Sequence, residues 1–170
     1  SVPLLILFLI DDLKGLKPLI RILIQCALSG YMIFSTGVYL ESLGNLFGLG
    51  NINLGLFGIP FTLLCVVGVM NAFNMMDGIN GLCSGCAMLA LILIGFSSGL
   101  IYDSMLVLII GSTLGFVIFN LGFLGKKRGV FLGDSGSNLI GFWVAWIAVY
   151  ASQNQNYFIE PITMLWFIAI

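Results

Sequence analysis

The chain has 170 residues, of which 60% are apolar and only 8% are charged. A soluble domain of this length could not cover so much apolar surface with so few polar side chains, so the composition excludes a water-soluble fold and indicates a lipid environment. The net charge of -1 and the absence of a long basic tract exclude a nucleic-acid partner.

Long apolar segments predict an all-α fold, a polytopic transmembrane helical bundle. Backbone polar groups must be paired inside hydrocarbon, and these segments are longer than membrane strands, which favours helices. In chain order, we expect helices at residues 1–10, 19–40, 52–70, 82–101, 104–124, 136–152 and 159–170. The first and last cannot cross about 30 Å of hydrocarbon, so we expect about five complete spans and two truncated ones. We interpret residues 1–170 as a single transmembrane domain, a fragment cut at both ends.

Prolines and glycines are expected to shape individual helices. Pro18 fits the first turn of the second helix, where a missing N–H is tolerated. Pro60 is expected to kink the third helix, because proline removes one backbone hydrogen bond. Gly111 and Gly115 have the spacing that lets two helices approach closely in lipid.

The distribution of charge predicts the topology. All 6 basic residues fall in two segments, 14–21 and 126–128. Four expected helices separate these segments, so both face the same side, which the positive-inside rule identifies as the cytoplasm. The loop at 71–81 lies two helices from either segment and faces the same side. The carboxylates then divide into a cytoplasmic set, Asp11, Asp12, Asp77 and Asp134, and an outward set, Glu41, Asp103 and Glu160.

The first polar stretch is the pair Asp11 and Asp12, which closes the first apolar segment. Two adjacent like charges at a membrane face repel unless a cation or hydrogen-bond donors hold them, and a divalent metal would do so. The alternative is a solvated helix end with capping aspartates.

The second polar stretch, Asn71 to Leu82, ends a long apolar helix with three asparagines, one aspartate and two glycines. Asn71, Asn74 and Asp77 are three residues apart, so they share one face if the helix continues through them. The glycines permit a sharp turn or close approach of a ligand. The alternative is a polar helix terminus with a glycine cap.

The third polar stretch, residues 131–138, precedes a helix. Its glycines and hydroxyls could present backbone N–H groups to a phosphate at the helix N-terminus, with Asp134 as a metal ligand. Lys127 and Arg128 lie close by in sequence and would offset anionic charge. The alternative is an ordinary loop that caps a helix.

Together, the three stretches predict a cytoplasmic site for a phosphorylated substrate held with a divalent cation. Their ligands are oxygen atoms and the chain has no histidine, which favours Mg²⁺, with Mn²⁺ as the alternative. Phosphoryl transfer follows, because the metal neutralises charge on bridging oxygens and a carboxylate can orient the attacking oxygen or accept its proton.

In order along the chain, Asp-Asp, Asn-Ala-Phe-Asn-Met-Met-Asp-Gly-Ile-Asn-Gly-Leu and Phe-Leu-Gly-Asp-Ser-Gly-Ser resemble motifs of the polyprenyl-phosphate N-acetylhexosamine-1-phosphate transferases, glycosyltransferase family 4. The resemblance covers nearly the whole chain. Its second motif is closer to the bacterial enzymes that start O-antigen and enterobacterial common antigen on undecaprenyl phosphate than to the peptidoglycan enzyme.

The resemblance implies a Mg²⁺-dependent transferase that moves N-acetylglucosamine-1-phosphate from UDP-GlcNAc to undecaprenyl phosphate and releases UMP. Another UDP-amino sugar or UDP-MurNAc-pentapeptide is the alternative donor. The implied location is the bacterial inner membrane, multi-pass, with the active site facing the cytoplasm; a homodimer is left open. We assign catalysis to Asp11, Asp12 and Asp77, metal binding to Asp134 and Asp12, and substrate binding to Asn71, Asn74, Asn80, Lys127, Arg128, Gly133 and Ser135.

The chain departs from the family pattern at Asn80, where many members carry a second aspartate, so an essential charge there is not expected. The family's histidine-bearing loop would lie beyond Ile170, and we expect the 170-residue piece alone to be inactive. The main rival function is a cation-coupled transporter or channel, whose carboxylates should lie near the bilayer midplane. A CDP-alcohol phosphatidyltransferase is disfavoured by the spacing after Asp77, and a catalytically inactive scaffold has no need of polar helix ends.

Overall fold

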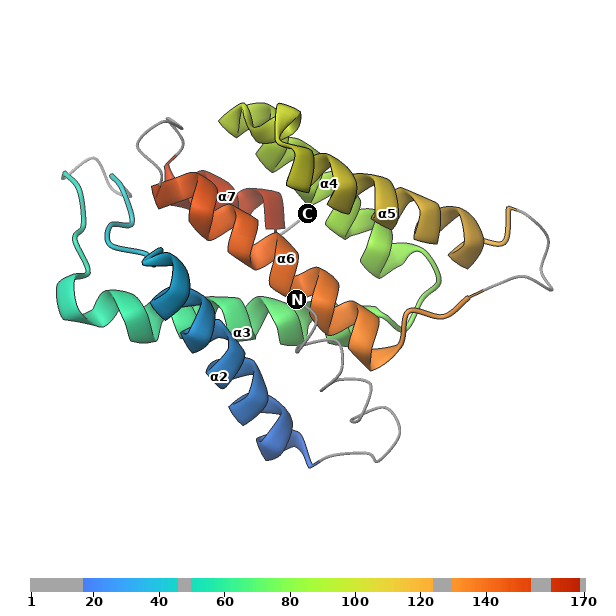
Figure 1. The fold of residues 1–170 in the computed structure, drawn as a ribbon, viewed down its shortest axis with the longest axis horizontal. Coiled ribbons are helices and arrows are strands. Elements are labelled where there is room, and N and C mark those ends of the chain that lie inside the picture. Colours follow the sequence, from blue (N-terminus) through green and yellow to red (C-terminus); the bar gives the residue numbers. More distant parts are fainter. Residues whose placement is uncertain (1–16, 46–49, 124–129, 154–159, 169–170) are drawn as a thin grey trace.

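The computed structural model describes residues 17–45, 50–123, 130–153 and 160–168, and within these ranges the fold is all-α, as predicted (Figure 1). The helices are α2 (Pro18–Thr36), α3 (Gly58–Met76), α4 (Leu82–Ser98), α5 (Ser104–Asn120), α6 (Gly133–Gln153) and α7 (Pro161–Ile168), with short 3₁₀ helices η1 (Gly55–Phe57) and η2 (Leu100–Tyr102). The helix expected at 1–10 lies outside the described residues.

Helix α6 is the centre of the bundle, packed against α3, α4 and α7 (Figure 1). Helix α2 packs on α3, and α5 on α4. A buried cluster around Val66, Met70 and Phe142 fills the space between α2, α3 and α6, and a second cluster around Leu91 and Ile94 joins α4 to α6 and α7.

Helices α3 and α6 approach each other closely at Gly141 of α6. A Cβ atom placed there would lie 2.9 Å from Met70 Cα and 3.2 Å from Phe73 Cβ, so only glycine lets α3 and α6 pack at this distance. The expectation for Gly111 and Gly115 is not met among the described residues, because a Cβ at either would have no neighbour within 4 Å.

Hydrogen bonds join the ends of neighbouring helices at both ends of the bundle. At one end, the Gly81 N–H before α4 donates to Asn120 Oδ1 at the end of α5, and Asn120 Nδ2 donates to Val130 O before α6 at 2.7 Å. At the opposite end, the Glu41 N–H donates to Gln153 Oε1 at 3.0 Å and the Asn45 N–H to Glu160 Oε2 at 3.0 Å. Among the described acidic residues, Asp77 and Asp134 lie at the first end, and Glu41, Asp103 and Glu160 lie at the second, as the predicted topology requires.

Several helix boundaries differ from the sequence prediction by a few residues, and those of α3 differ most. Helix α6 begins at Gly133 rather than at 136, so most of the third polar stretch lies inside its first turns. Helix α2 ends at Thr36 rather than at 40, because Gly37 adopts a left-handed conformation with φ 69° and its N–H bonds Ile33 O. Helix α3 runs from Gly58 to Met76 instead of 52–70, so Pro60 lies in the first turn, where no backbone bond is lost. The expected kink is therefore wrong, whereas Pro18 does occupy the first turn of α2.

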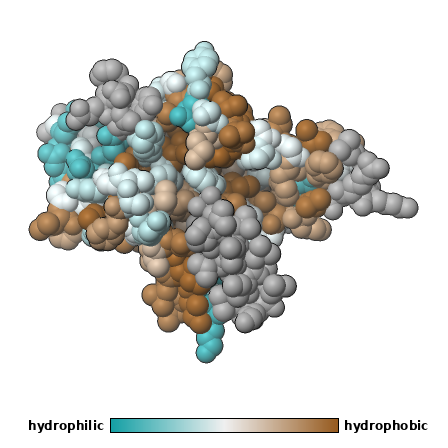
Figure 2. All heavy atoms as spheres, in the orientation of Figure 1, coloured by the Kyte–Doolittle hydropathy of each residue, from teal (hydrophilic) through white to brown (hydrophobic). Residues whose placement is uncertain are grey.

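Large apolar side chains are exposed at the surface, including Phe34, Leu64, Phe96 and Leu108. Figure 2 shows that apolar residues occupy several parts of one face. Within the described residues, Pro18–Thr36 and Gly55–Met76 are long and apolar enough to cross a membrane, and α4 and α5 are shorter apolar helices. Such outward apolar faces suit hydrocarbon better than water.

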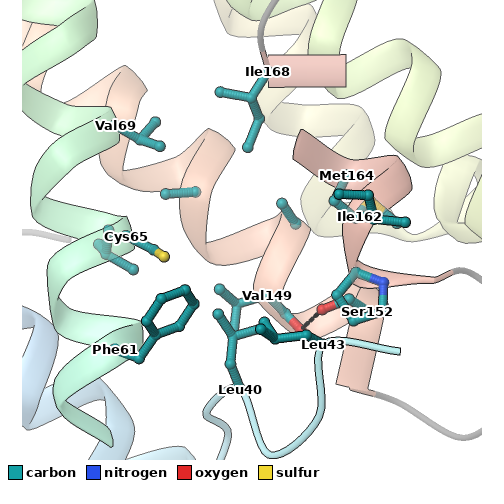
Figure 3. Close-up of a pocket in the computed structure, with 14 residues that line it drawn as sticks. Leu40, Leu43, Phe61, Cys65, Val69, Val149, Ser152, Ile162, Met164 and Ile168 are labelled. Carbon is teal, nitrogen blue, oxygen red and sulfur yellow. Dashed lines mark hydrogen bonds between the residues drawn. The ribbon is translucent and has the colours of Figure 1, made fainter. Parts of the chain in front are cut away.

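An apolar cavity of about 330 Å³ lies between α3, α6 and α7. Phe61 and Cys65 of α3 face Met164 of α7 across it, and Ser152 lies at its edge (Figure 3). The lining offers almost no polar group, so this cavity is unsuited to a phosphorylated ligand.

Candidate functional site

The site forms where the start of α2, the end of α3 and the start of α6 meet. Arg21 Nη1 of α2 lies 2.8 Å from Asp134 Oδ2 of α6, and the two side chains are 21% and 44% exposed. A half-exposed carboxylate with a partly buried cationic neighbour can still reach a ligand from solvent. Arg21 therefore belongs to this site. From the sequence alone, its charge indicated only the side of the membrane that its segment faces.

Asp77 follows α3 directly and faces the start of α6. The backbone N–H of Gly133 donates to its carboxylate, which lowers the pKa of Asp77, but burial and the nearby charge of Asp134 raise it. Burial is the largest of these effects, so the pKa of Asp77 lies above the ordinary value. Gly133 has φ +67°, a backbone conformation that favours glycine and turns its N–H toward this carboxylate.

The raised pKa of Asp77 predicts how stability depends on pH. Because folding disfavours the ionised carboxylate, wild-type stability should fall as pH rises through the folded pKa, relative to Asp77→Asn. Asparagine keeps an oxygen that can accept the Gly133 N–H. The check is the unfolding midpoint of both proteins in detergent with EDTA across acid to neutral pH; a difference with the opposite slope would contradict the burial argument.

Asn74 of α3 reaches α6 through its side-chain oxygen. The hydroxyl of Ser137 donates to Asn74 Oδ1 at 2.8 Å, and Asn138 Nδ2 donates to the same atom at 3.4 Å. Asn74 and Asp77 therefore lie on the face of α3 that meets α6, as the three-residue spacing predicts. Because α3 continues to Met76, Asn74 is held by helical backbone, and Asp77 is the first residue after the helix.

Asn71 lies deeper in the bundle than the carboxylates. Its Nδ2 donates to Gln25 Oε1 of α2 and to Val67 O, each at 2.8 Å. Gln25 Nε2 in turn donates to Asn138 Oδ1 of α6 at 2.7 Å. These amides form a continuous polar network that joins α2, α3 and α6 behind the site.

The remaining predicted residues are placed less closely. Asn80 is exposed in the turn between α3 and α4, and Ser135 lies in the first turn of α6. Asp11, Asp12, Lys127 and Arg128 lie outside the described residues. The structure adds Arg21, Gln25, Ser137 and Asn138 to the site. The available signal was the four-residue spacing of Arg21 and Gln25, and of Asp134 and Asn138, in apolar helices.

The donor set at the site suits a hard divalent cation. Asp77, Asp134 and Asn74 supply oxygen atoms, which Mg²⁺ prefers. Among the described residues, no group of three or more histidine, cysteine, aspartate or glutamate side chains could hold a metal ion.

Comparisons with known proteins find one matching family model and several similar proteins. The family model described as glycosyl transferase family 4 matches residues 1–152. The chain is 39% identical over 165 residues to the undecaprenyl-phosphate alpha-N-acetylglucosaminyl 1-phosphate transferase of Escherichia coli strain K12, covering 95% of this chain and 45% of the relative. Proteins of the same name from Yersinia pestis and Haemophilus influenzae are 40% and 37% identical over 168 and 175 residues, covering 95% and 98% of this chain and 45% and 48% of each relative. The chain thus spans about half the length of these relatives.

Proposed function

The chain belongs to glycosyl transferase family 4, and from this membership we propose that the full-length protein transfers N-acetylglucosamine-1-phosphate from UDP-GlcNAc to undecaprenyl phosphate, releasing UMP. The names of the relatives support the sugar, the phosphate and the lipid acceptor. The product would initiate synthesis of O-antigen or a related cell-envelope polysaccharide.

One observation carries the proposal: Arg21, Asn74, Asp77 and Asp134 converge at one end of the bundle. A cation, two carboxylates and amide groups at a helix end suit a diphosphate with its metal. A transporter would need its carboxylates along a path through the interior, whereas Asp77 and Asp134 lie beside helix ends.

In the proposed reaction, an oxygen of the lipid phosphate attacks the sugar-bearing phosphorus of UDP-GlcNAc. The new P–O bond forms as the bond from that phosphorus to the bridging oxygen breaks, and UMP leaves with the bridging oxygen. Mg²⁺, when bound by Asp134 and Asp12, would supply positive charge for the diphosphate oxygens. Arg21 provides a second positive charge next to Asp134, where it can offset the charge of a bound phosphate.

Within the same proposal, Asn74 and Asp77 orient the nucleotide-sugar, and Asp11 and Asp12 serve the lipid phosphate. The N-terminus of α6 adds its dipole at the same place, which favours an anionic group. The site then lies at the cytoplasmic face of a bacterial inner membrane, because Arg21 belongs to it and the positive-inside rule assigns the basic segments of the sequence to that side. A soluble donor and a membrane-embedded acceptor can both reach that position.

The decisive assay supplies full-length protein with UDP-GlcNAc labelled in the sugar and with undecaprenyl phosphate. We expect labelled lipid and free UMP in equal amounts with Mg²⁺, and neither with EDTA. Restoring activity with excess Mg²⁺ or Mn²⁺ controls for damage by the chelator. Labelled lipid formed only from UDP-MurNAc-pentapeptide or another UDP-sugar would replace the proposed donor, and ion flux without any lipid product would favour a transporter.

A further inference from the structure

Gln25 is a long polar side chain with no exposed surface, in a helix apolar enough to cross a membrane. Both ends of its amide are bonded: Nε2 donates to Asn138 Oδ1 at 2.7 Å, and Oε1 accepts from Asn71 Nδ2 at 2.8 Å. A buried amide is costly unless both ends are satisfied, so this arrangement holds Gln25 in one orientation between α3 and α6.

The bond from Gln25 to Asn138 lies one helical turn from the ion pair at the site. Arg21 precedes Gln25 by four residues on α2, and Asp134 precedes Asn138 by four residues on α6. Residues four apart lie above one another on a helix, about 6 Å along its axis. The two contacts therefore form successive rungs between the same two helices, and sliding α2 along α6 would break both.

Asn138 also connects Gln25 to the other groups of the site. Its Nδ2 donates to Asp134 O at 2.7 Å and lies 3.4 Å from Asn74 Oδ1. The orientation of the Asn138 amide decides whether this donor faces Asn74, and the bond from Gln25 Nε2 sets that orientation by requiring an oxygen on the other side. Gln25 thus influences the orientation of polar groups on α2, α3 and α6.

We propose that Gln25 is a positioning residue for the transfer reaction: from inside the bundle it sets the register of α2 against α6, and so holds Arg21 beside Asp134 and Asn138 beside Asn74. This inference rests on the proposed function for its kinetic consequence. Its structural consequence, the register itself, can be measured without any substrate.

The kinetic test compares Gln25→Met with Thr62→Val in the full-length protein. Thr62 is equally buried, accepts from the Leu40 N–H at 2.8 Å and donates to Gly58 O at 2.7 Å, but it lies at the opposite end of α3. Both variants remove buried hydrogen bonds and should lower the unfolding midpoint. Only Gln25→Met should lower kcat/KM for UDP-GlcNAc, per folded protein, by about tenfold to a hundredfold.

A second comparison separates positioning from stability. Arg21→Gln should reduce kcat/KM much less in the Gln25→Met background than in the wild type, because Arg21 has already left Asp134. Equal effects of Arg21→Gln in both backgrounds, or equal kcat/KM for Gln25→Met and Thr62→Val, would overturn the inference. Absence of transfer by the wild type would instead refute the proposed function.

The register is measured with spin labels on cysteines introduced at Leu19 and Phe131, which are 70% and 79% exposed, after alanine replaces the native cysteines. We expect the distribution of label-to-label distances to shift or broaden in Gln25→Met and to stay unchanged in Thr62→Val. An unchanged distribution in Gln25→Met would overturn the inference whatever the enzymatic result.

Discussion

Replacing Asp134 with asparagine is expected to lower Mg²⁺-dependent transfer by about a hundred- to a thousandfold. The carboxylate lies at the start of α6, 2.8 Å from Arg21, and is 44% exposed, so it can bind a cation that enters from solvent. Loss of a metal ligand weakens stabilisation of the transition-state charge by several kcal/mol, and each 1.36 kcal/mol is about tenfold in rate. Labelled-lipid formation by the full-length protein measures the effect.

Asp103→Asn is the matched control for Asp134→Asn. Asp103 lies at the opposite end of the bundle, where its Oδ1 accepts from the Met105 N–H at 2.8 Å and caps α5. Asparagine caps helices as well as aspartate does, so this change should leave both folding and transfer intact. If Asp134→Asn retained full activity at limiting Mg²⁺, Asp134 would not be a metal ligand.

Gly141→Leu should cause a large loss of stability, because it overpacks the contact between α3 and α6. Even a methyl group there would lie 2.9 Å from Met70 Cα and 3.4 Å from Val69 O, and backbone atoms cannot rotate away. Overpacking in a close-packed interior costs about 1–3 kcal/mol, and leucine should reach or exceed that range. The free energy of unfolding in mixed micelles, followed by helical circular dichroism, provides the measurement.

Gly68→Leu controls for the loss of a glycine from a membrane helix. Gly68 precedes Val69 and Met70 on α3, but a Cβ there would meet no atom within 4 Å. Its replacement should leave stability unchanged or raise it by up to about 1 kcal/mol, because glycine is a poor helix former. Equal losses for both variants would show that the contact between α3 and α6 is not limiting.

Much of the fold could be predicted because each apolar segment is a local property of the sequence. Helices α4 and α5 begin at Leu82 and Ser104, as expected, since glycine and aspartate precede them. The end of α3 could not be predicted in this way. Asn71 and Asn74 resemble a helix terminus when considered locally, but bonds to Gln25, Ser137 and Asn138 let the helix continue through them.

The candidate site was predictable to the extent that its residues cluster in sequence. The second and third polar stretches do meet, as the bond from the Gly133 N–H to Asp77 shows. Arg21 and Gln25 were not assigned to the site, because their four-residue spacing marks a polar face of one helix but does not identify the residues that this face meets. The functional assignments of Asp11 and Asp12 stay predictions, outside the described residues.

By itself, the sequence determined the lipid environment, the all-α class and the family, because composition, apolar segment length and motif order do not depend on how the helices pack. Only the tertiary structure decided which polar groups face one another. The bond between Gln25 and Asn138 joins residues 113 apart, and Arg21 meets Asp134 from the same two helices. Such pairs depend on the register and rotation of one helix against another, which the close contact at Gly141 and the buried amides between α2, α3 and α6 determine together.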